Sequence, residues 1–368
     1  MNQTDVLEIP AGTVPDETEF LRAAMEWHFS PATGSPFWLR RAASLDFDPR
    51  TDITSFADLR LFPNVTDELR DIPTGDLIPA GFGPRPDIVS VIESGGTTGA
   101  PKRLPFLRQF ARLMAEAEAS YLREAGLSPT GHWMSLFPSG PQGALDQARR
   151  SAAEFGDGIL VFAIDLDPRW VKKLTTQGRR DEVSAYVDHI VEQAAWILES
   201  QDVSTLRVTA PVLARLAADE RLSDLIRRKI RYIGWGGTQL DPDTRYLYRT
   251  EIFPEATLRG AYGTTMALGG GGRERHGLGH DEPCVYDPNL SPYVTLEVVD
   301  PEAHRPVAVG ERGQLIVHHV SRSFFLPNNA ERDFATRIAP ARHQIGDSVA
   351  DIAPMPAFKG AAVVEGVY

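Results

Sequence analysis

The sequence predicts an α/β fold with mostly parallel sheets, followed by a β-rich segment near the end of the chain. Between about residues 87 and 262, short apolar runs typical of strands alternate with amphipathic stretches typical of helices. Such alternation favours α/β layers. Beyond about residue 290, segments 293–299 and 314–320 are rich in β-forming residues, and no helical pattern separates them. We therefore expect a small β subdomain appended to an α/β body.

Three regions follow from this pattern in a chain of 368 residues. Residues 1–80 predict a helical entry region packed on the body, with an apolar helical pattern over residues 18–28. Residues 81–285 predict the α/β core, and residues 286–368 the small β-rich subdomain with a short hinge. This length is sufficient for a large core and two or three subdomains.

Residues 107–122 and 181–199 predict helices, the second with apolar side chains on one face. Pro211 and the pair Asp241-Pro242 are placed to open two more helices, with Asp241 as an N-cap. The segments that predict strands are 87–92, 133–137, 159–164, 206–210, 232–235 and 258–262. We expect the first of these to be buried.

Composition excludes several classes of protein. The net charge is -12 and no basic run stands out, so we expect no nucleic-acid partner. No apolar run approaches the ~20 residues that a membrane span requires, so we expect no membrane partner. The N-terminus is acidic and lacks the apolar segment of a signal peptide. The single cysteine, Cys284, cannot form a disulfide within the chain, which is typical of a cytoplasmic protein.

In open α/β sheets, ligands bind at the carboxyl ends of strands. The candidate site segments are therefore the predicted strand exits at residues 93–103, 137–143, 235–239 and 260–266.

The first exit, residues 93–103, reads ESGGTTGAPKR. Glycines let successive backbone N–H groups point at one anion, while hydroxyl groups and a lysine add donors and charge. This chemistry suits a polyphosphate. An ordinary Gly/Thr loop with a solvated lysine is the alternative, but the clustering of these residue types disfavours it. The segment is not a Walker A loop, because Pro101 precedes Lys102 and Arg103 follows it.

The segment from Gly95 to Lys102 resembles the phosphate loop of the adenylate-forming superfamily, which includes acyl-CoA synthetases, peptide-synthetase adenylation domains and luciferase. The resemblance implies the N-terminal body of that fold, with two packed, mostly parallel α/β subdomains and a small β-barrel-like subdomain. It implies ATP as cofactor and AMP as product-side ligand, with Lys102 catalytic. The residues that it implies in the phosphate cradle are Ser94, Gly95, Gly96, Thr97, Thr98 and Gly99.

The exit at residues 260–266 carries Gly260, Ala261, Tyr262, Gly263, Thr264 and Thr265. A tyrosine packed at a glycine-rich turn would explain it without a ligand. The segment also resembles the family's Tyr-Gly-x-Thr-Glu motif, which implies Tyr262 on adenine and Thr265 on the α-phosphate. The family's metal-binding glutamate is replaced by Met266, and a thioether does not bind a hard divalent cation. We therefore expect no protein metal ligand, and Mg²⁺ held through the phosphates.

Three further segments extend the resemblance. Gly236 and Gly237 resemble a turn that borders adenine and the acyl pocket, and Asp347 resembles the aspartate that accepts hydrogen bonds from ribose. At the exit after residue 136 the resemblance implies an acyl pocket, and the residues expected to line it are Phe137, Gly140 and Trp235. Plain turns would account for each segment taken alone.

His276 and His280, followed by Asp281 and Glu282, have metal-like spacing, but the surrounding glycines favour a mobile polar loop. Ser94 and Ser139 lack the Gly-x-Ser-x-Gly context of a hydrolase.

The chain ends 21 residues after Asp347, so we expect the family's mobile C-terminal domain to be absent. Residues 287–301 resemble phenylacetate–CoA ligase relatives, with adenylating proteins of phenazine-antibiotic (griseoluteic acid type) biosynthesis as the nearest likeness. This resemblance implies activation of an aromatic carboxylic acid as an acyl-adenylate. Transfer of the acyl group would need an acceptor enzyme or carrier, and a homodimer stays open. The alternative is a catalytically impaired nucleotide- or acid-binding protein.

Overall fold

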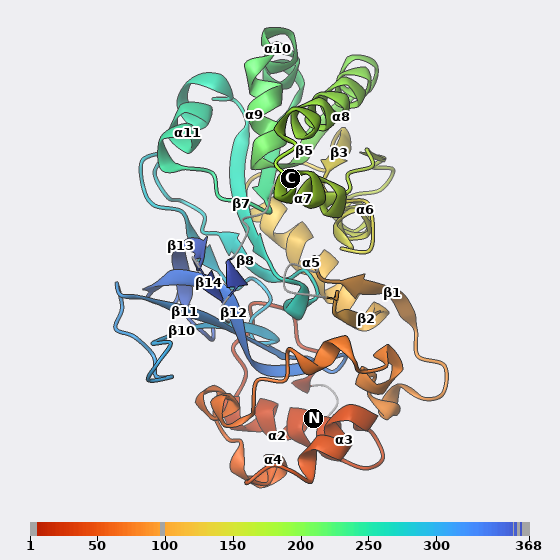
Figure 1. The fold of residues 1–368 in the computed structure, drawn as a ribbon, viewed down its shortest axis with the longest axis vertical. Helices are drawn as coiled ribbons and strands as arrows, with labels where there is room; N and C mark the ends of the chain where they lie inside the picture. Colours follow the sequence, from red (N-terminus) through yellow and green to blue (C-terminus); the bar gives the residue numbers. More distant parts are fainter. Residues whose placement is uncertain (1–5, 96–99, 356, 359–360, 363–368) are drawn as a thin grey trace. The chain divides into compact units, whose positions relative to one another are not determined.

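The structure is a computed structural model that describes residues 6–95, 100–355, 357–358 and 361–362. Figure 1 shows the chain coloured along its sequence. It divides into two compact units. Unit 1 comprises Met1–Met114, Thr264–Gly272 and Asp287–Met355, and unit 2 comprises Ala115–Gly263, Arg273–Tyr286 and Pro356–Tyr368. The predicted α/β class is confirmed, since the structure contains helices together with parallel and antiparallel strand pairs.

The helical entry of unit 1 begins with three capped helices. They are α2 (Glu17–Phe29), α3 (Pro36–Ala42) and α4 (Pro49–Asp52). Their N-cap residues Asp16, Ser35 and Asp48 accept hydrogen bonds from backbone N–H groups of the first turn. The proline-rich connection that follows contains four short turns: η1 (Phe56–Leu61), η2 (Glu68–Arg70), η3 (Thr74–Leu77) and η4 (Ala80–Phe82).

Aromatic side chains hold this entry region against a strand within the same unit. The rings of Phe29, Trp38 and Phe62 each lie within 5.1–5.7 Å of the Phe325 ring, centroid to centroid. The Trp38 indole N–H also donates to the Phe325 carbonyl at 2.8 Å. Packing of this kind buries large apolar area, so it fixes the helices to the strand.

The β-rich part of unit 1 is an antiparallel sheet in the order β10 (Val294–Val299), β11 (Arg312–Val320), β12 (Phe325–Ile338) and β13 (Ser348–Pro354). The predicted strands at 293–299 and 314–320 correspond to β10 and β11. Strand β12 was not predicted, because polar residues interrupt its apolar pattern from Asn328 onward.

The prediction of a buried strand over residues 87–92 is wrong in its burial and its setting. β1 (Ile88–Glu93) pairs antiparallel with β2 (Arg103–Leu107), and only Ile92 of β1 is buried. Glu93 therefore ends β1 and Arg103 begins β2, so this segment does not leave a parallel strand. The helix predicted from residue 107 follows β2 as α5 (Arg108–Glu124).

Unit 2 contains a parallel sheet in the order β4 (Val161–Ala163), β3 (His132–Leu136), β5 (Val203–Thr209), β6 (Tyr232–Gly236) and β7 (Thr257–Gly263). These strands confirm five of the predicted segments. Figure 1 shows the long helix α8 (Arg180–Ser200) beside α9 (Ala210–Ala218) and α10 (Glu220–Lys229), and α9 contacts β5.

The remaining helices of unit 2 are α6 (Ala144–Phe155), α7 (Pro168–Thr176) and α11 (Pro242–Leu247), which continues as the π-helical turn η5 (Tyr248–Ile252). Asp241 caps α11 by accepting from the Thr244 N–H at 2.9 Å, as predicted. Within the described residues, no helix is both long and apolar enough to cross a membrane.

Four short strands complete the chain: β8 (Gly271–Glu274), β9 (Val285–Asp287), β14 (Ala357–Phe358) and β15 (Ala361–Ala362). Gly271 and Gly272 belong to β8 and are buried, and residues 276–282 beyond it form no helix or strand, as expected of a loop. Small residues suit a strand where neighbouring backbone lies close.

Candidate functional site

The base of the predicted phosphate loop is closed by two hydrogen bonds between Ser94 and Lys102. The Ser94 N–H donates to the Lys102 carbonyl at 3.0 Å, and the Lys102 N–H donates to Ser94 Oγ at 2.9 Å. One residue further from the loop on each strand, Arg103 Nε forms an ion pair with Glu93 Oε1 at 2.8 Å. Gly95 continues the loop, whereas Gly96, Thr97, Thr98 and Gly99 lie outside the described residues. The hairpin thus sets where the loop begins and ends.

A carboxylate that sequence reasoning missed lies near the base of this loop. Glu331 Oε1 accepts from Thr264 Oγ1 at 2.6 Å and from Asn329 Nδ2 at 2.7 Å. Burial raises the pKa of Glu331, and the hydrogen bonds from Thr264 and Asn329, with the charge of Lys102, oppose that rise without reversing it. Unit 1 therefore brings Lys102, Thr264 and Glu331 together. No sequence signal marked Glu331, because it lies on an irregular strand far along the chain from the loop.

Thr264 begins the short turn η6 (Thr265–Ala267), where the family motif would place its glutamate. The Thr264 hydroxyl accepts from the Met266 N–H at 3.3 Å, which caps the turn. The Met266 side chain is only 5% exposed. This position is therefore an apolar anchor of unit 1, and Thr265 beside it is half-buried.

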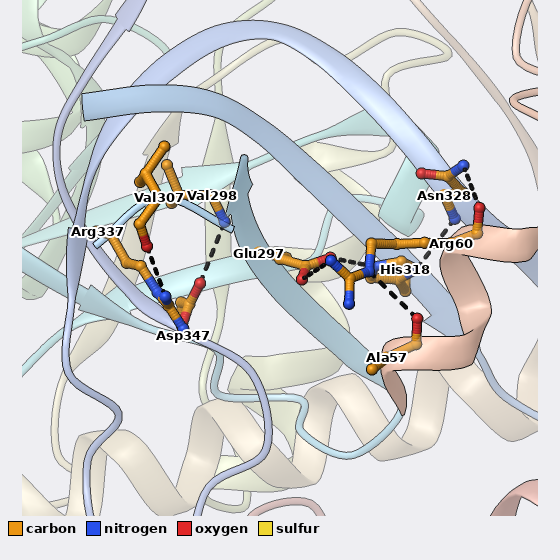
Figure 2. Close-up of polar contacts among 9 residues, drawn as sticks. All are labelled: Ala57, Arg60, Glu297, Val298, Val307, His318, Asn328, Arg337 and Asp347. Atoms are coloured by element: carbon orange, nitrogen blue, oxygen red, sulfur yellow. Dashed lines mark hydrogen bonds and ion pairs between the residues drawn. The ribbon is translucent and has the colours of Figure 1, made fainter. Parts of the chain in front are cut away.

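Asp347 is held from both sides within unit 1, as Figure 2 shows. Arg337 Nε donates to Oδ1 at 2.9 Å, and the Val298 N–H donates to Oδ2 at 3.1 Å. Arg337 also donates to the Val307 carbonyl at 2.6 Å. Burial raises the pKa of Asp347, and the hydrogen bond from Arg337 lowers it only in part. In this conformation both carboxylate oxygens already serve the fold.

A second polar group in Figure 2 ties η1 to the antiparallel sheet. Glu297 lies 3.5 Å from Arg60 Nη1 and 3.5 Å from His318 Nε2. Asn328 donates through Nδ2 to the Arg60 carbonyl at 3.2 Å. Arg60 donates through Nε to the Ala57 carbonyl at 3.2 Å. These contacts stabilise the unit, and they also surround Glu297 with partners.

In unit 2, the predicted site residues lie on both faces of the parallel sheet. A Cβ built on Gly236 would lie 3.7 Å from Phe137 Cζ, so these two residues share a face. Trp235 precedes Gly236 in the same strand and points to the opposite face, where it lies against Gly260. Gly140 is exposed in the turn beyond Phe137. The structure therefore groups Phe137 with Gly236, and Trp235 with Gly260.

The structure favours glycine at three of these positions. A Cβ on Gly236 would lie 2.9 Å from the Ala261 carbonyl oxygen, which belongs to the backbone and cannot move aside unless the strand shifts. A Cβ on Gly260 would lie 2.8 Å from both Trp235 Cζ2 and the Tyr286 hydroxyl. Gly237, with φ near +84°, occupies the left-handed region that favours glycine. Close strand packing is thus one reason for glycines that the family motif also contains.

A buried glutamate fixes the strand that leads to Ala261, Tyr262 and Gly263. Glu274 is fully buried, and its Oε2 accepts from the Gly260 N–H at 2.7 Å. Arg249 pairs with the same carboxylate and donates to the Leu258 carbonyl at 2.9 Å. Arg259 lies 3.6 Å from Glu274 Oε1. This network fixes β7 from Leu258 to Gly260, directly before Ala261.

The histidine pattern at residues 276–282 has a packing role in part. The His276 ring lies 4.2 Å from the Tyr121 ring, centroid to centroid. Among the described residues, no group of three or more His, Cys, Asp or Glu side chains is arranged to hold a metal ion.

Comparison with known proteins identifies the fold. No protein-family model matches the chain, and no curated protein matches it in sequence. An open structure of 2-hydroxyisobutyryl-CoA ligase with 2-HIB-AMP and CoA is similar with a TM-score of 0.61 and 17% identity, over 93% of this chain and 71% of that one. Its thioesterification-state structure gives 0.60 and 16% identity, over 89% and 65%.

An anthranilate CoA ligase in complex with anthranoyl-AMP gives a TM-score of 0.50 at 17% identity, over 72% of this chain and 47% of that one. The chain thus spans about two thirds of the length of the first of these ligases and about half of the second. It has the fold of the N-terminal body of adenylate-forming ligases. At these identities the similarity establishes the fold alone.

Proposed function

We propose that this protein activates a carboxylic acid as an acyl-adenylate, with release of pyrophosphate from ATP. The observation that carries the proposal is the pair of hydrogen bonds that join Ser94 and Lys102 at the two ends of the Gly/Thr segment. A lysine beside backbone amides suits a polyphosphate. The fold similarity to ligases whose structures contain acyl-AMP supports the same chemistry.

In the proposed reaction, a carboxylate oxygen of the acid attacks the α-phosphorus of ATP. The new bond joins that oxygen to phosphorus, and the bond from the α-phosphorus to the bridging oxygen breaks. The electron pair of that bond leaves with pyrophosphate. No proton moves, because a carboxylic acid is ionised at neutral pH.

Catalysis would rest on positioning and on charge stabilisation. Lys102 would stabilise negative charge on the phosphates, and Thr265 would bind the α-phosphate. Tyr262 would pack on adenine beside Gly236 and Gly237. Mg²⁺ bound to the phosphates would neutralise charge on the leaving pyrophosphate.

We propose a planar aromatic acid as substrate, from the subfamily resemblance, in a pathway of the phenazine-antibiotic type. Phe137 offers an aromatic surface beside Gly236 for such a ring. The anthranilate ligase among the similar structures binds an aromatic acyl-adenylate, which supports this choice. Transfer of the acyl group would fall to an acceptor enzyme or carrier.

A nucleotide- or acid-binding role without turnover is the second candidate. Two observations favour it: Met266 is buried and offers no oxygen ligand, and both oxygens of Asp347 are already engaged. Ribose binding by Asp347 would require Arg337 or the Val298 N–H to release the carboxylate.

The test is ATP–pyrophosphate exchange by the purified protein with Mg²⁺ and a panel of aromatic mono- and dicarboxylic acids. We expect acid-dependent exchange that falls at least about 100-fold in Lys102→Ala, since loss of a donor to developing charge costs that much in other enzymes. Arg103→Ala is the matched control, because it removes a neighbouring cation that already pairs with Glu93.

Exchange that persists in Lys102→Ala would refute the role of that lysine. ATP binding without exchange for any acid would favour the binding role. Absence of both would refute the proposed function.

A further inference from the structure

Glu331 is an unexpected residue to find beside a loop proposed to bind phosphates. A carboxylate repels phosphate oxygens of the same sign, and burial of that charge adds a desolvation cost. Its surroundings nevertheless orient it closely, since Thr264 and Asn329 both donate to Oε1. Asn329 is buried, and the Thr66 hydroxyl contacts its amide oxygen. A carboxylate fixed near phosphates is unfavourable unless a positive charge lies close to it.

Lys102 supplies one positive charge, but it does not fully compensate Glu331. The two side chains that donate to its Oε1, Thr264 and Asn329, are neutral, so they orient the carboxylate without neutralising its charge. When a polyphosphate binds Lys102, the positive charge of the lysine would be shared between Glu331 and the phosphates. A divalent cation between Glu331 and the phosphates would remove both the repulsion and the shortage of positive charge.

The donor chemistry fits such a cation. Mg²⁺ and Mn²⁺ bind carboxylate oxygens, and Mg²⁺ in nucleotide sites commonly takes one or two carboxylates in addition to phosphates and water. Thr264 and Asn329 both donate to Oε1 of the carboxylate, and Gln314 Nε2 donates to the backbone carbonyl of the same residue, so the group is oriented from two sides. Met266, two residues after Thr264, has only a buried thioether to offer.

We propose that Glu331 is the protein ligand of the divalent cation that accompanies the nucleotide phosphates, supplied from β12 instead of from position 266. This inference rests on the proposed function. Thr264 and Asn329 are then positioning residues, because they act on the cation only through the carboxylate. The alternative role for Glu331 is that of a counterion for Lys102 alone.

The two roles differ in how ATP affinity responds to Mg²⁺. If Glu331 is a cation ligand, Glu331→Gln should weaken binding of ATP in excess MgCl₂. The same variant should leave binding in EDTA equal or stronger, because a negative charge near the phosphates is gone. If Glu331 serves only Lys102, the variant should change both affinities by the same factor.

The experiment is calorimetric titration of the full chain with ATP, once in excess MgCl₂ and once in EDTA. We expect the ratio of the two affinities to fall about tenfold or more in Glu331→Gln, and less in Glu331→Asp, which keeps the charge but shortens the side chain. Glu302→Gln is the matched control, since it makes the same charge change at an exposed turn of unit 1. Electron paramagnetic resonance of Mn²⁺ with ATP should show a protein-bound signal that Glu331→Gln changes and Glu302→Gln does not.

Each outcome decides between the inference and the proposed function. A wild-type protein that binds no ATP in either condition would overturn both. ATP binding without a Mg²⁺ advantage in the wild type would overturn the cation role and leave nucleotide binding in place. An unchanged affinity ratio in Glu331→Gln would also overturn the cation role. Should Glu331→Gln not fold, a full Mg²⁺ advantage in Glu331→Asp together with an unaltered Mn²⁺ signal would do the same.

Discussion

Each unit contains a glutamate withdrawn from solvent, Glu118 almost fully in unit 2 and Glu331 in part in unit 1, and the two are compensated differently. In unit 2, Glu118 accepts from Arg207 at 3.0 Å and from Arg273 at 2.7 Å. Burial alone would raise the pKa of Glu118, but the charges of the two arginines overcome burial and lower it. In unit 1, Glu331 has two neutral donors and a single lysine, and its pKa stays raised.

The difference indicates what each carboxylate is for. A buried carboxylate between two guanidinium groups is complete without a ligand, so Glu118 serves the fold. A carboxylate whose charge is only partly compensated is poised to accept a proton or a cation, which is more typical of functional sites. Asp347 is intermediate, because one arginine and one backbone N–H hold it and its pKa is still raised.

The largest effect expected from this comparison is on the stability of unit 2. Glu118→Gln would leave Arg207 and Arg273 buried without a carboxylate, and we expect a loss of about 3–5 kcal/mol in the free energy of unfolding. Urea unfolding checks this, with Asp146→Asn as a control at an exposed ion pair. A loss no larger than that of the control would show that the network is not needed for the fold.

A smaller effect is expected at Asp347. Arg337→Met removes a guanidinium that donates to both Asp347 and the Val307 carbonyl, and we expect a cost of about 1–3 kcal/mol. If Asp347 is freed for ribose, the same variant should bind ATP more tightly although it unfolds more easily. Unchanged ATP affinity would indicate that Asp347 serves the sheet alone.

The smallest effect is expected in the pH dependence of stability. Because the folded pKa of Glu331 is raised, the folded protein holds this proton at a pH where the unfolded chain, with an ordinary value of 4.5, has released it. Ionisation therefore opposes folding above the folded pKa and not below pH 4.5. Glu331→Gln should be more stable than wild type at neutral pH by up to about 1 kcal/mol, since partial exposure screens the charge.

Thermal melts at pH 7 and at pH 4 test this. The gain should disappear at the lower pH, where both proteins carry a neutral side chain. A variant that is less stable at pH 7 would indicate that the Lys102–Glu331 attraction outweighs the desolvation cost.

The sequence by itself determined the local elements of the parallel sheet. Apolar strands such as β6 and β7 are short and bounded by glycine, and helices such as α8 and α11 have strong periodicity or an Asp-Pro start. Local patterns of this kind depend on neighbours along the chain, so the sequence alone can reveal them. The glycine-rich motifs were likewise visible as residue types, and their roles toward ATP remain proposals.

Tertiary structure decided the rest. The sequence predicts a buried strand, a loop and then a helix here, and it misses the pairing of β1 with β2, because an apolar run does not reveal its pairing partner. Whether Phe137 and Trp235 share a face depends on strand register. The grouping of Lys102, Thr264 and Glu331 joins residues more than 200 positions apart in sequence. Contacts of that range arise from packing of the whole unit, and local residue patterns carry no record of them.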